Sequence, residues 1–199
     1  SDPLAEGPTI QRASFHALAE GVTLATCLQV SRKLRSDGVR VPLVLMGYYN
    51  PILSYGLERF AADAQDVGVD GVIVPDLPWE ETGPLHRECR RQGIHLVPLL
   101  APTSTDARIA QACEEASGFV YCVSLTGVTG VRPELSSGIP ALTQRVRKHT
   151  DLPLAIGFGI SRRQHVEELA PWAEAMVVGS ALIEVVEKAP PGERREAVK

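Results

Sequence analysis

Six short apolar runs, each followed by a pattern typical of a helix, organise this 199-residue sequence. The runs start at Val41, Val69, Ile94, Phe119, Leu152 and Ala175. Apolar runs without polar alternation predict strands that are buried on both faces, as in a parallel sheet covered by helices. Between the runs, apolar residues recur every three or four positions, as on one face of a helix. This alternation predicts an α/β fold with a parallel sheet and right-handed crossovers.

Turn and capping residues set the expected boundaries. Pro8 fits the first turn of a helix that runs to about Glu20, and Thr23 fits the start of a second helix. We expect this second helix to turn three apolar side chains towards the core: Cys27, Val30 and Leu34. The predicted strands span residues 41–49, 69–75, 94–100 and 119–123, the first being broken by Asn50-Pro51. The helices after them are predicted at residues 57–67, 80–92, 105–116 and 139–149.

Two glycine turns near the end of the chain indicate a ligand site. The run from Leu154 ends in Gly157-Phe158-Gly159-Ile160-Ser161, and the run from Ala175 ends in Gly179-Ser180-Ala181. Glycine lets backbone approach a ligand closely, and a helix N-terminus offers free N–H groups to an anion. Either turn alone is equally well explained as a tight strand-to-helix connection. Two in succession favour phosphate binding, because (β/α)8 barrels commonly hold phosphate after strands seven and eight.

The number of strands bears on the architecture. A closed (β/α)8 barrel has eight strands and about 250 residues, whereas this sequence predicts six strands preceded by a helix. We therefore expect one TIM-barrel domain over residues 1–199, with its first two strands and one helix missing ahead of Ser1. A dinucleotide-binding Rossmann fold is poorly supported, because no GxGxxG motif follows an early strand.

Candidate chemistry lies at the carboxyl ends of the strands, where TIM barrels have their active sites. The candidates there are Asp2, Tyr48, Tyr49, Asn50, Asp76, Thr103, Tyr121, Thr129, Phe158 and Ser180. Asp2 is either a proton acceptor or an Asx turn before Pro3. Tyr121 either binds substrate through its hydroxyl or is a core tyrosine bonded to backbone, and Asp76 is either catalytic or a turn cap. The long glycine-containing loop after Val123 suggests an active-site lid.

Composition narrows the class of protein. A net charge of −4 and a pI of about 5.8 give no basic surface for nucleic acid. No apolar run approaches the roughly 20 residues that a membrane helix needs. We interpret the four widely separated cysteines as buried, reduced thiols of a cytoplasmic protein; they are Cys27, Cys89, Cys113 and Cys122. The histidines are scattered and show no metal-ligand spacing.

Seven segments occur in an order typical of one family. They are SDPLAEGPTIQ from Ser1, LMGYYNP from Leu45, GVDGVIVPDLPWEE from Gly68, PLLAPTST from Pro98, SLTGVTGVR from Ser124, IGFGIS from Ile156 and VVGSALIE from Val177. Together these segments resemble the α subunit of tryptophan synthase. The resemblance extends from Ser1 to about Glu187, and the ordered set is far more specific than any one glycine turn.

The resemblance implies a (β/α)8 barrel that cleaves indole-3-glycerol phosphate to indole and glyceraldehyde 3-phosphate. This is a retro-aldol reaction without a metal or organic cofactor. Asp2 matches the carboxylate that stabilises the indole N–H. The substrate-contacting positions of the family match Tyr121, Thr129 and Phe158, and its phosphate-binding positions match Gly130, Gly159, Gly179 and Ser180. The family also uses a glutamate on the strand before the SDP motif as general acid/base, and no residue here matches it, because Glu6 follows the motif.

The resemblance also implies a partner. The family's α subunit docks on a β subunit that uses pyridoxal phosphate to join indole to serine in an α2β2 complex. Residues 3–11 and the turn at Pro78 match family regions at that contact. Two other hypotheses remain open on sequence. One is another sugar-phosphate barrel enzyme, which the SDP and GVTG motifs disfavour; the other is a catalytically incompetent phosphate-binding module that regulates the β subunit.

Overall fold

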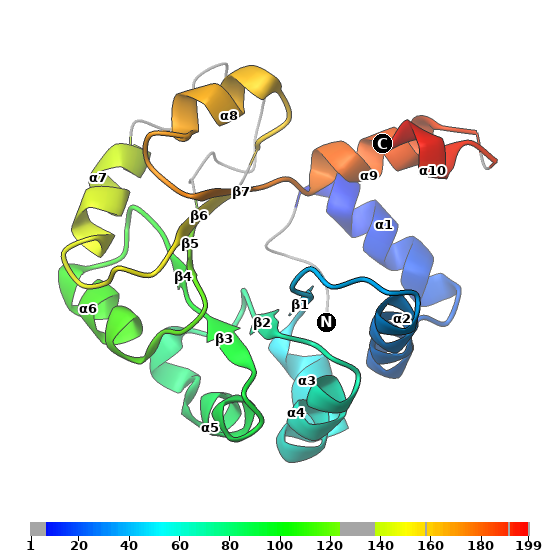
Figure 1. Ribbon diagram of the computed structural model, residues 1–199, viewed down its shortest axis with the longest axis horizontal. Helices are drawn as coiled ribbons and strands as arrows, with labels where there is room; N and C mark the ends of the chain where they lie inside the picture. Colours follow the sequence, from blue (N-terminus) through cyan, green and yellow to red (C-terminus); the bar gives the residue numbers. More distant parts are fainter. Residues whose placement is uncertain (1–6, 124–137, 158, 191, 199) are drawn as a thin grey trace.

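Parallel strands form an arc at the centre of the molecule, and helices surround the arc (Figure 1). The computed structural model describes residues 7–123, 138–157, 159–190 and 192–198. The strands are β1 (Val44–Met46), β2 (Gly71–Ile73), β3 (His95–Val97), β4 (Leu99–Leu100), β5 (Val120–Val123), β6 (Leu154–Gly157) and β7 (Ala175–Val177). They pair in chain order, as β1-β2-β3 and as β4-β5-β6-β7, and every pair is parallel. The predicted parallel α/β architecture is therefore confirmed.

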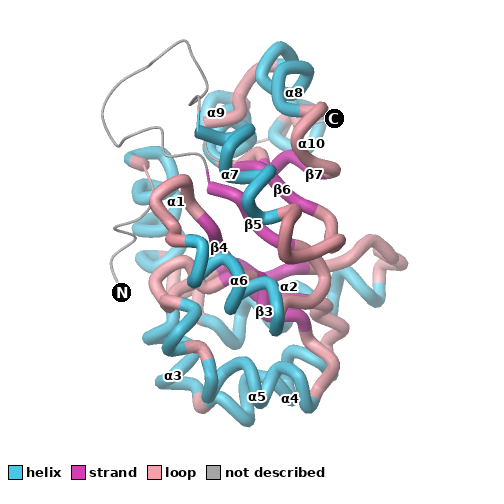
Figure 2. Tube along the Cα trace, turned by 90° about the vertical axis from the view of Figure 1, so that its left-hand side faces the viewer, coloured by secondary structure: helices cyan, strands magenta, loops and turns pink. Residues whose placement is uncertain are grey.

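The helices lie on the outside of the strands, as the side view also shows (Figure 2). They are α1 (Pro8–Ala19), α2 (Leu24–Ser36), α3 (Tyr49–Tyr55), α4 (Leu57–Asp66), α5 (Gly83–Arg91), α6 (Asp106–Glu115), α7 (Gly138–Val146), α8 (Arg163–Leu169), α9 (Ser180–Lys188) and α10 (Arg194–Ala197), with a 3-10 turn η1 at Trp79–Glu81. The first and ninth helices lie side by side (Figure 1). They are joined by an ion pair of 3.2 Å between Arg12 and Glu187.

The third predicted strand is divided by Pro98. Residues 95–97 pair with β2, and residues 99–100 pair with β5. Proline has no N–H to donate to a strand ladder, so the pairing is interrupted at this position. Its carbonyl still accepts a hydrogen bond of 3.0 Å from the Tyr121 N–H. All six predicted strands are thus present, and the third one connects the two sheets.

β2, β5 and β6 are buried on both faces, as their apolar sequences predict, whereas β1 and β7 at the two ends of the arc are partly exposed. Ile73, Val97, Tyr121 and Ala155 pack against one another in one cluster, contributed by β2, β3, β5 and β6. Neighbouring strand residues point the other way and pack against helices. One outer cluster joins β2 and β3 to α3–α5, and the other joins β4–β6 to α6–α8. The strands that carry the candidate residues at their carboxyl ends are therefore packed between the inner cluster and the helices.

Two predicted boundaries are wrong for local reasons. The first strand is only three residues long, because a helix already begins at Tyr49. Pro51 does not break this segment; it lies in the first turn of α3, where a missing N–H costs nothing. The helix predicted at residues 80–92 is divided into η1 and α5, which starts at Gly83 with Pro84 in its first turn.

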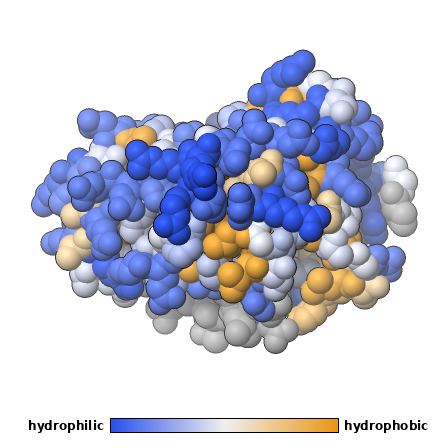
Figure 3. All heavy atoms as spheres, turned by 90° about the horizontal axis from the view of Figure 1, so that it is seen from below, coloured by the Kyte–Doolittle hydropathy of each residue, from blue (hydrophilic) through white to orange (hydrophobic). Residues whose placement is uncertain are grey.

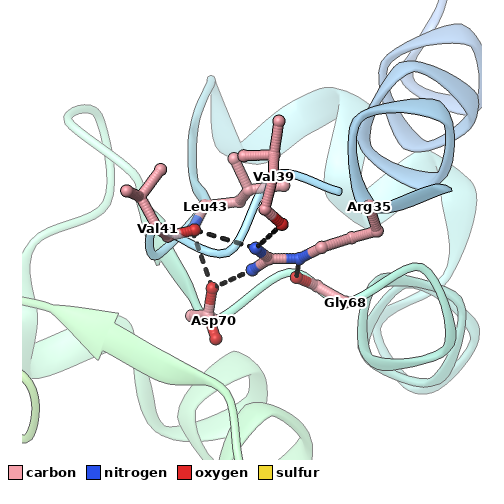
Figure 4. Close-up of polar contacts among 6 residues, drawn as sticks. All are labelled: Arg35, Val39, Val41, Leu43, Gly68 and Asp70. Carbon is pink, nitrogen blue, oxygen red and sulfur yellow. Dashed lines mark hydrogen bonds and ion pairs between the residues drawn. The ribbon is translucent and has the colours of Figure 1, made fainter. Parts of the chain in front are cut away.

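The inward face of α2 also differs from the prediction. Val30 is 54% and Leu34 is 37% exposed, and Cys27 is exposed as well, whereas Leu28 and Ser31 are buried. Arg35 gives the reason. Its guanidinium donates hydrogen bonds to the carbonyls of Gly68, Val39 and Val41 and pairs with the Asp70 carboxylate (Figure 4). These polar contacts, together with the packing of Leu24 and Leu28 in the outer cluster, hold this face of the helix inward.

The other three cysteines are buried as predicted. Burial raises the pKa of the Cys89 and Cys122 thiols to about 12 and also raises the pKa of Cys113. A thiol is nucleophilic only as its thiolate, so these three residues are inert packing groups at neutral pH.

The face of the molecule seen from below is largely hydrophilic and carries separate apolar patches (Figure 3). Within the described part of the chain, each helix is too short or too polar to cross a lipid bilayer.

Candidate active site

The carboxyl ends of β5, β6 and β7 lie in line. Val123 pairs with Gly157, and Gly157 pairs in turn with Val177. Gly159 and Gly179 each follow these paired residues by two positions. Because the three strands are parallel, both glycine turns leave the sheet at the carboxyl ends of the strands. The register therefore places the two predicted phosphate-binding turns next to each other.

The second turn opens a helix, as its sequence predicts. Gly179 is the N-cap of α9, and Ser180 is the first helical residue. Among the described residues, no side chain caps this helix. The N–H groups of Leu182 and Ile183 donate to the Gly179 carbonyl. Gly179 and Ser180 are exposed. An exposed, uncapped helix N-terminus presents backbone donors and a partial positive charge to an anion.

The first turn is longer. Gly159 has φ of +76°, a conformation that side chains disfavour. Ile160 is buried and anchors the turn, and α8 begins only at Arg163. The first turn therefore presents exposed backbone at Gly159. Unlike the second turn, it does not lead directly into a helix.

The ring of Tyr121 packs directly over Gly157. A Cβ on Gly157 would clash with the Tyr121 hydroxyl oxygen, and it would lie 2.6 Å from Cζ of that ring and 2.9 Å from Cβ of Val177. Only glycine leaves room for the ring at this point. The tyrosine ring thus extends from β5 across β6, at the strand residue that immediately precedes the first glycine turn.

Tyr121 is 4% exposed. Burial raises the pKa of its phenol to about 12. The hydroxyl therefore keeps its proton at neutral pH and is available as a hydrogen-bond donor. Its buried neighbours in the cluster are aliphatic, namely Ile73, Val97 and Ala155.

The structure assigns Asp76 a role in helix capping. Its carboxylate accepts a hydrogen bond of 2.9 Å from the Tyr49 N–H, which lies in the first turn of α3. The contact holds the start of α3 rather than the turn that follows β2, and the catalytic alternative for Asp76 stays a prediction. Tyr49 itself packs against the outer cluster, and Asn50 and Thr103 are exposed. These residues are not brought together with Tyr121.

Four predicted site residues lie outside the described residues: Asp2, Thr129, Phe158 and Gly130. The lid predicted after Val123 also falls there. Their assignments remain predictions from the sequence resemblance. The described part of the site consists of Tyr121, Gly159, Gly179 and Ser180.

Two buried polar atoms stand apart from the glycine turns, one on the candidate Tyr48 and one on Trp79, which the sequence did not single out. The Tyr48 hydroxyl and the Trp79 Nε1 are buried without a hydrogen-bond partner among the described residues. Trp79 also helps to line a cavity of about 280 Å³ behind the loop that follows β2. That cavity does not include the two glycine turns.

Comparison with known proteins identifies the family. The family model for the tryptophan synthase alpha chain matches residues 1–199. The chain belongs to the tryptophan synthase alpha chain family. It is 56% identical to the tryptophan synthase alpha chain of Roseiflexus sp. (strain RS-1), over 97% of this chain and 74% of that protein. It is 47% identical to the Geobacillus kaustophilus alpha chain, over 100% of this chain and 75% of that protein.

Solved structures of the family have the same fold. The tryptophan synthase α2β2 complex from Pyrococcus furiosus contains a chain that matches with a TM-score of 0.91 and 38% identity. The match covers 100% of this chain and 79% of that one. The (β/α)8 class and the family membership predicted from the ordered motifs are both confirmed.

Gly179 offers a test of the phosphate turn. A Cβ at Gly179 meets nothing within 4 Å, so a side chain has room, although the φ of −117° and ψ of −84° lie outside the favoured helix and strand regions. Gly179→Val is expected to cost some stability, measured by thermal unfolding, and to weaken substrate binding at least tenfold by blocking the anion's approach. Calorimetric titration with glycerol 3-phosphate measures this. Gly83→Val is the matched control, because Gly83 also opens a helix and has open space around its Cα. Equal affinities in the two variants would remove Gly179 from the phosphate site.

Proposed function

We propose that this chain cleaves indole-3-glycerol phosphate to indole and glyceraldehyde 3-phosphate, as the α subunit of tryptophan synthase. The family match over residues 1–199 carries this proposal. The arrangement of the described residues supports it: an apolar cluster around Tyr121 lies beside two backbone turns suited to an anion. A substrate with an indole ring at one end and a phosphate at the other fits both. The family match does not favour the catalytically incompetent regulatory module.

The chemistry explains the residue types. Indole is a poor carbon leaving group until its C3 atom is protonated. An acid must deliver that proton while a carboxylate, Asp2, stabilises the positive charge that develops at N1. A base then takes the proton of the glycerol hydroxyl, the bond from C3 to the glycerol carbon breaks, and the aldehyde is released. The resemblance assigns the acid/base role to a glutamate that no residue between Ser1 and Lys199 matches.

The remaining residues bind rather than react. Gly130, Gly159, Gly179 and Ser180 hold the phosphate through backbone N–H groups and the N-terminus of α9. Tyr121 and Phe158 line the pocket of the indole and glycerol parts. Thr129 contacts Asp2 when the loop after β5 closes and excludes water from the reaction.

The partner of this chain is the tryptophan synthase β subunit, in an α2β2 complex of the kind solved for Pyrococcus furiosus. Pyridoxal phosphate belongs to the β subunit, and the cleavage by the α subunit uses no cofactor. The complex works in the cytoplasm. Residues 3–11 and the turn at Pro78 contribute to the contact.

The direct test is indole release. Full-length protein is mixed with indole-3-glycerol phosphate, alone and with purified β subunit, and indole is quantified by chromatography. We expect release in both cases and a higher rate in the complex. If neither preparation releases indole while glycerol 3-phosphate still binds, the regulatory module replaces the lyase as the better description.

A further inference from the structure

Two arginine–carboxylate clamps with the same geometry hold the outermost strand pairs of the described arc. Each consists of an arginine at or just after the end of a helix and an acidic residue just before a strand. The first is Arg35 with Asp70, at β1 and β2, and the second is Arg147 with Glu174, at β6 and β7. Both lie at the amino ends of their strands, opposite the candidate active site.

The first clamp is drawn in Figure 4. The Asp70 carboxylate accepts a hydrogen bond of 2.7 Å from the Leu43 N–H, and the Asp70 N–H donates to the Leu43 carbonyl at 2.8 Å. Arg35 pairs with the same carboxylate and donates to the Val41 carbonyl. The Asp70 side chain thus adds one hydrogen bond to the pairing of β1 with β2, just before the two strands begin.

The second clamp repeats each of these contacts. The Glu174 carboxylate accepts a hydrogen bond of 2.7 Å from the Leu154 N–H, and the Glu174 N–H donates to the Leu154 carbonyl at 3.1 Å. Arg147 pairs with the carboxylate and donates to the Leu152 carbonyl at 2.6 Å. The hydrogen bond from Leu154 is the main cause that lowers the pKa of Glu174, so the carboxylate is charged at neutral pH.

The β6–β7 pair needs such a constraint because its ladder is short. Only three residue pairs define it, and among the described strands β7 pairs with β6 alone. A slip of one residue would turn every side chain of β7 to the opposite face. An exposed ion pair by itself contributes little to stability, whereas a charge-assisted bond to a strand N–H fixes geometry.

The two strands that this clamp joins are the ones that carry the glycine turns. Leu154 is five residues before Gly159, and Glu174 is five residues before Gly179. We propose that Arg147 and Glu174 are positioning residues for phosphate binding: they fix β6 against β7 and so hold the two turns at the spacing that one phosphate needs. This inference rests on the proposed function, since it requires the phosphate to be held by both turns.

The matched clamp at β1 and β2 supplies the control. Glu174→Ala and Asp70→Ala each remove a carboxylate that is about half exposed. Each arginine loses its carboxylate partner but keeps its carbonyl acceptors, and the N–H of Leu154 or Leu43 loses its side-chain acceptor. We expect similar losses of stability, measured by thermal unfolding. Only Glu174→Ala is expected to weaken the binding of glycerol 3-phosphate, by roughly tenfold, less than the hundredfold that a 1 Å misplacement costs in an active site. Glu174→Gln keeps an acceptor for the Leu154 N–H and should restore part of the affinity.

The outcomes separate this inference from the proposed function. If the unaltered protein does not bind glycerol 3-phosphate, the proposed function fails. If it binds and both alanine variants lose affinity equally, the clamp acts only through global stability and the positioning role is wrong. Unchanged affinity in Glu174→Ala overturns it as well. Where Glu174→Ala does not fold, Arg147→Met is measured against Arg35→Met in the same way.

Discussion

Gly157→Ala is expected to destabilise the folded protein by about 3 kcal/mol or more, because the site is already full. The added methyl group would clash with the Tyr121 hydroxyl and lie 2.6 Å from Cζ of the same ring. Tyr121 is buried, and Val177 closes the other side at 2.9 Å, so the ring cannot swing away freely. Denaturant unfolding measures the loss. Because the ring borders the proposed indole pocket, the rate of indole release should fall along with stability.

A second substitution identifies the cause. Tyr121→Leu removes the ring and hydroxyl that the new methyl group would meet, although it leaves a cavity of its own. If the clash is responsible, the double variant is more stable than the sum of the two single losses predicts, by about 1 kcal/mol or more. Strictly additive losses would show that alanine at residue 157 is harmful for another reason. Gly71→Ala, in β2 of the other sheet, tests strand glycines in general, since the nearest contact of its Cβ would be the His95 carbonyl at 3.1 Å.

The glycine turns were predictable because their physics is local. A strand that ends in glycine and continues into a helix can be recognised from a few consecutive residues. The second turn has this form at Gly179 and Ser180. The parallel sheet followed from the uninterrupted apolar runs for the same reason. Even the division at Pro98 is implied by its missing N–H.

What the sequence could not reveal depends on residues far apart in the chain. The rotation of α2 follows from contacts of Arg35 with Gly68 and Asp70, more than 30 positions away. The contact of Asp76 with the Tyr49 N–H joins residues 27 positions apart. The tight fit of Tyr121 over Gly157 joins two strands, and neither residue carries a local sign of the other. Family resemblance supplied the function of Asp2, which no spacing rule gives.

Asp2→Asn is expected to lower the rate of indole release by about 10³-fold or more while substrate binding stays within a few-fold of normal. Asparagine has nearly the same shape as aspartate, and its carbonyl still accepts a hydrogen bond. It lacks the negative charge that stabilises the positive charge developing at the indole N1 as C3 is protonated. An interaction made mainly in the transition state lowers turnover and leaves the affinity for substrate almost unchanged.

Asp76→Asn is the control for this experiment, because Asp76 also follows a strand yet accepts the Tyr49 N–H as a helix cap. An asparagine serves nearly as well in capping, so turnover should change less than tenfold. Rates come from indole formation under saturating substrate, and affinity comes from titration with glycerol 3-phosphate. Near-normal turnover in Asp2→Asn would remove this residue from the mechanism. Loss of binding together with turnover would make Asp2 a binding residue, since a group that acts only on the developing charge leaves the phosphate end of the substrate untouched.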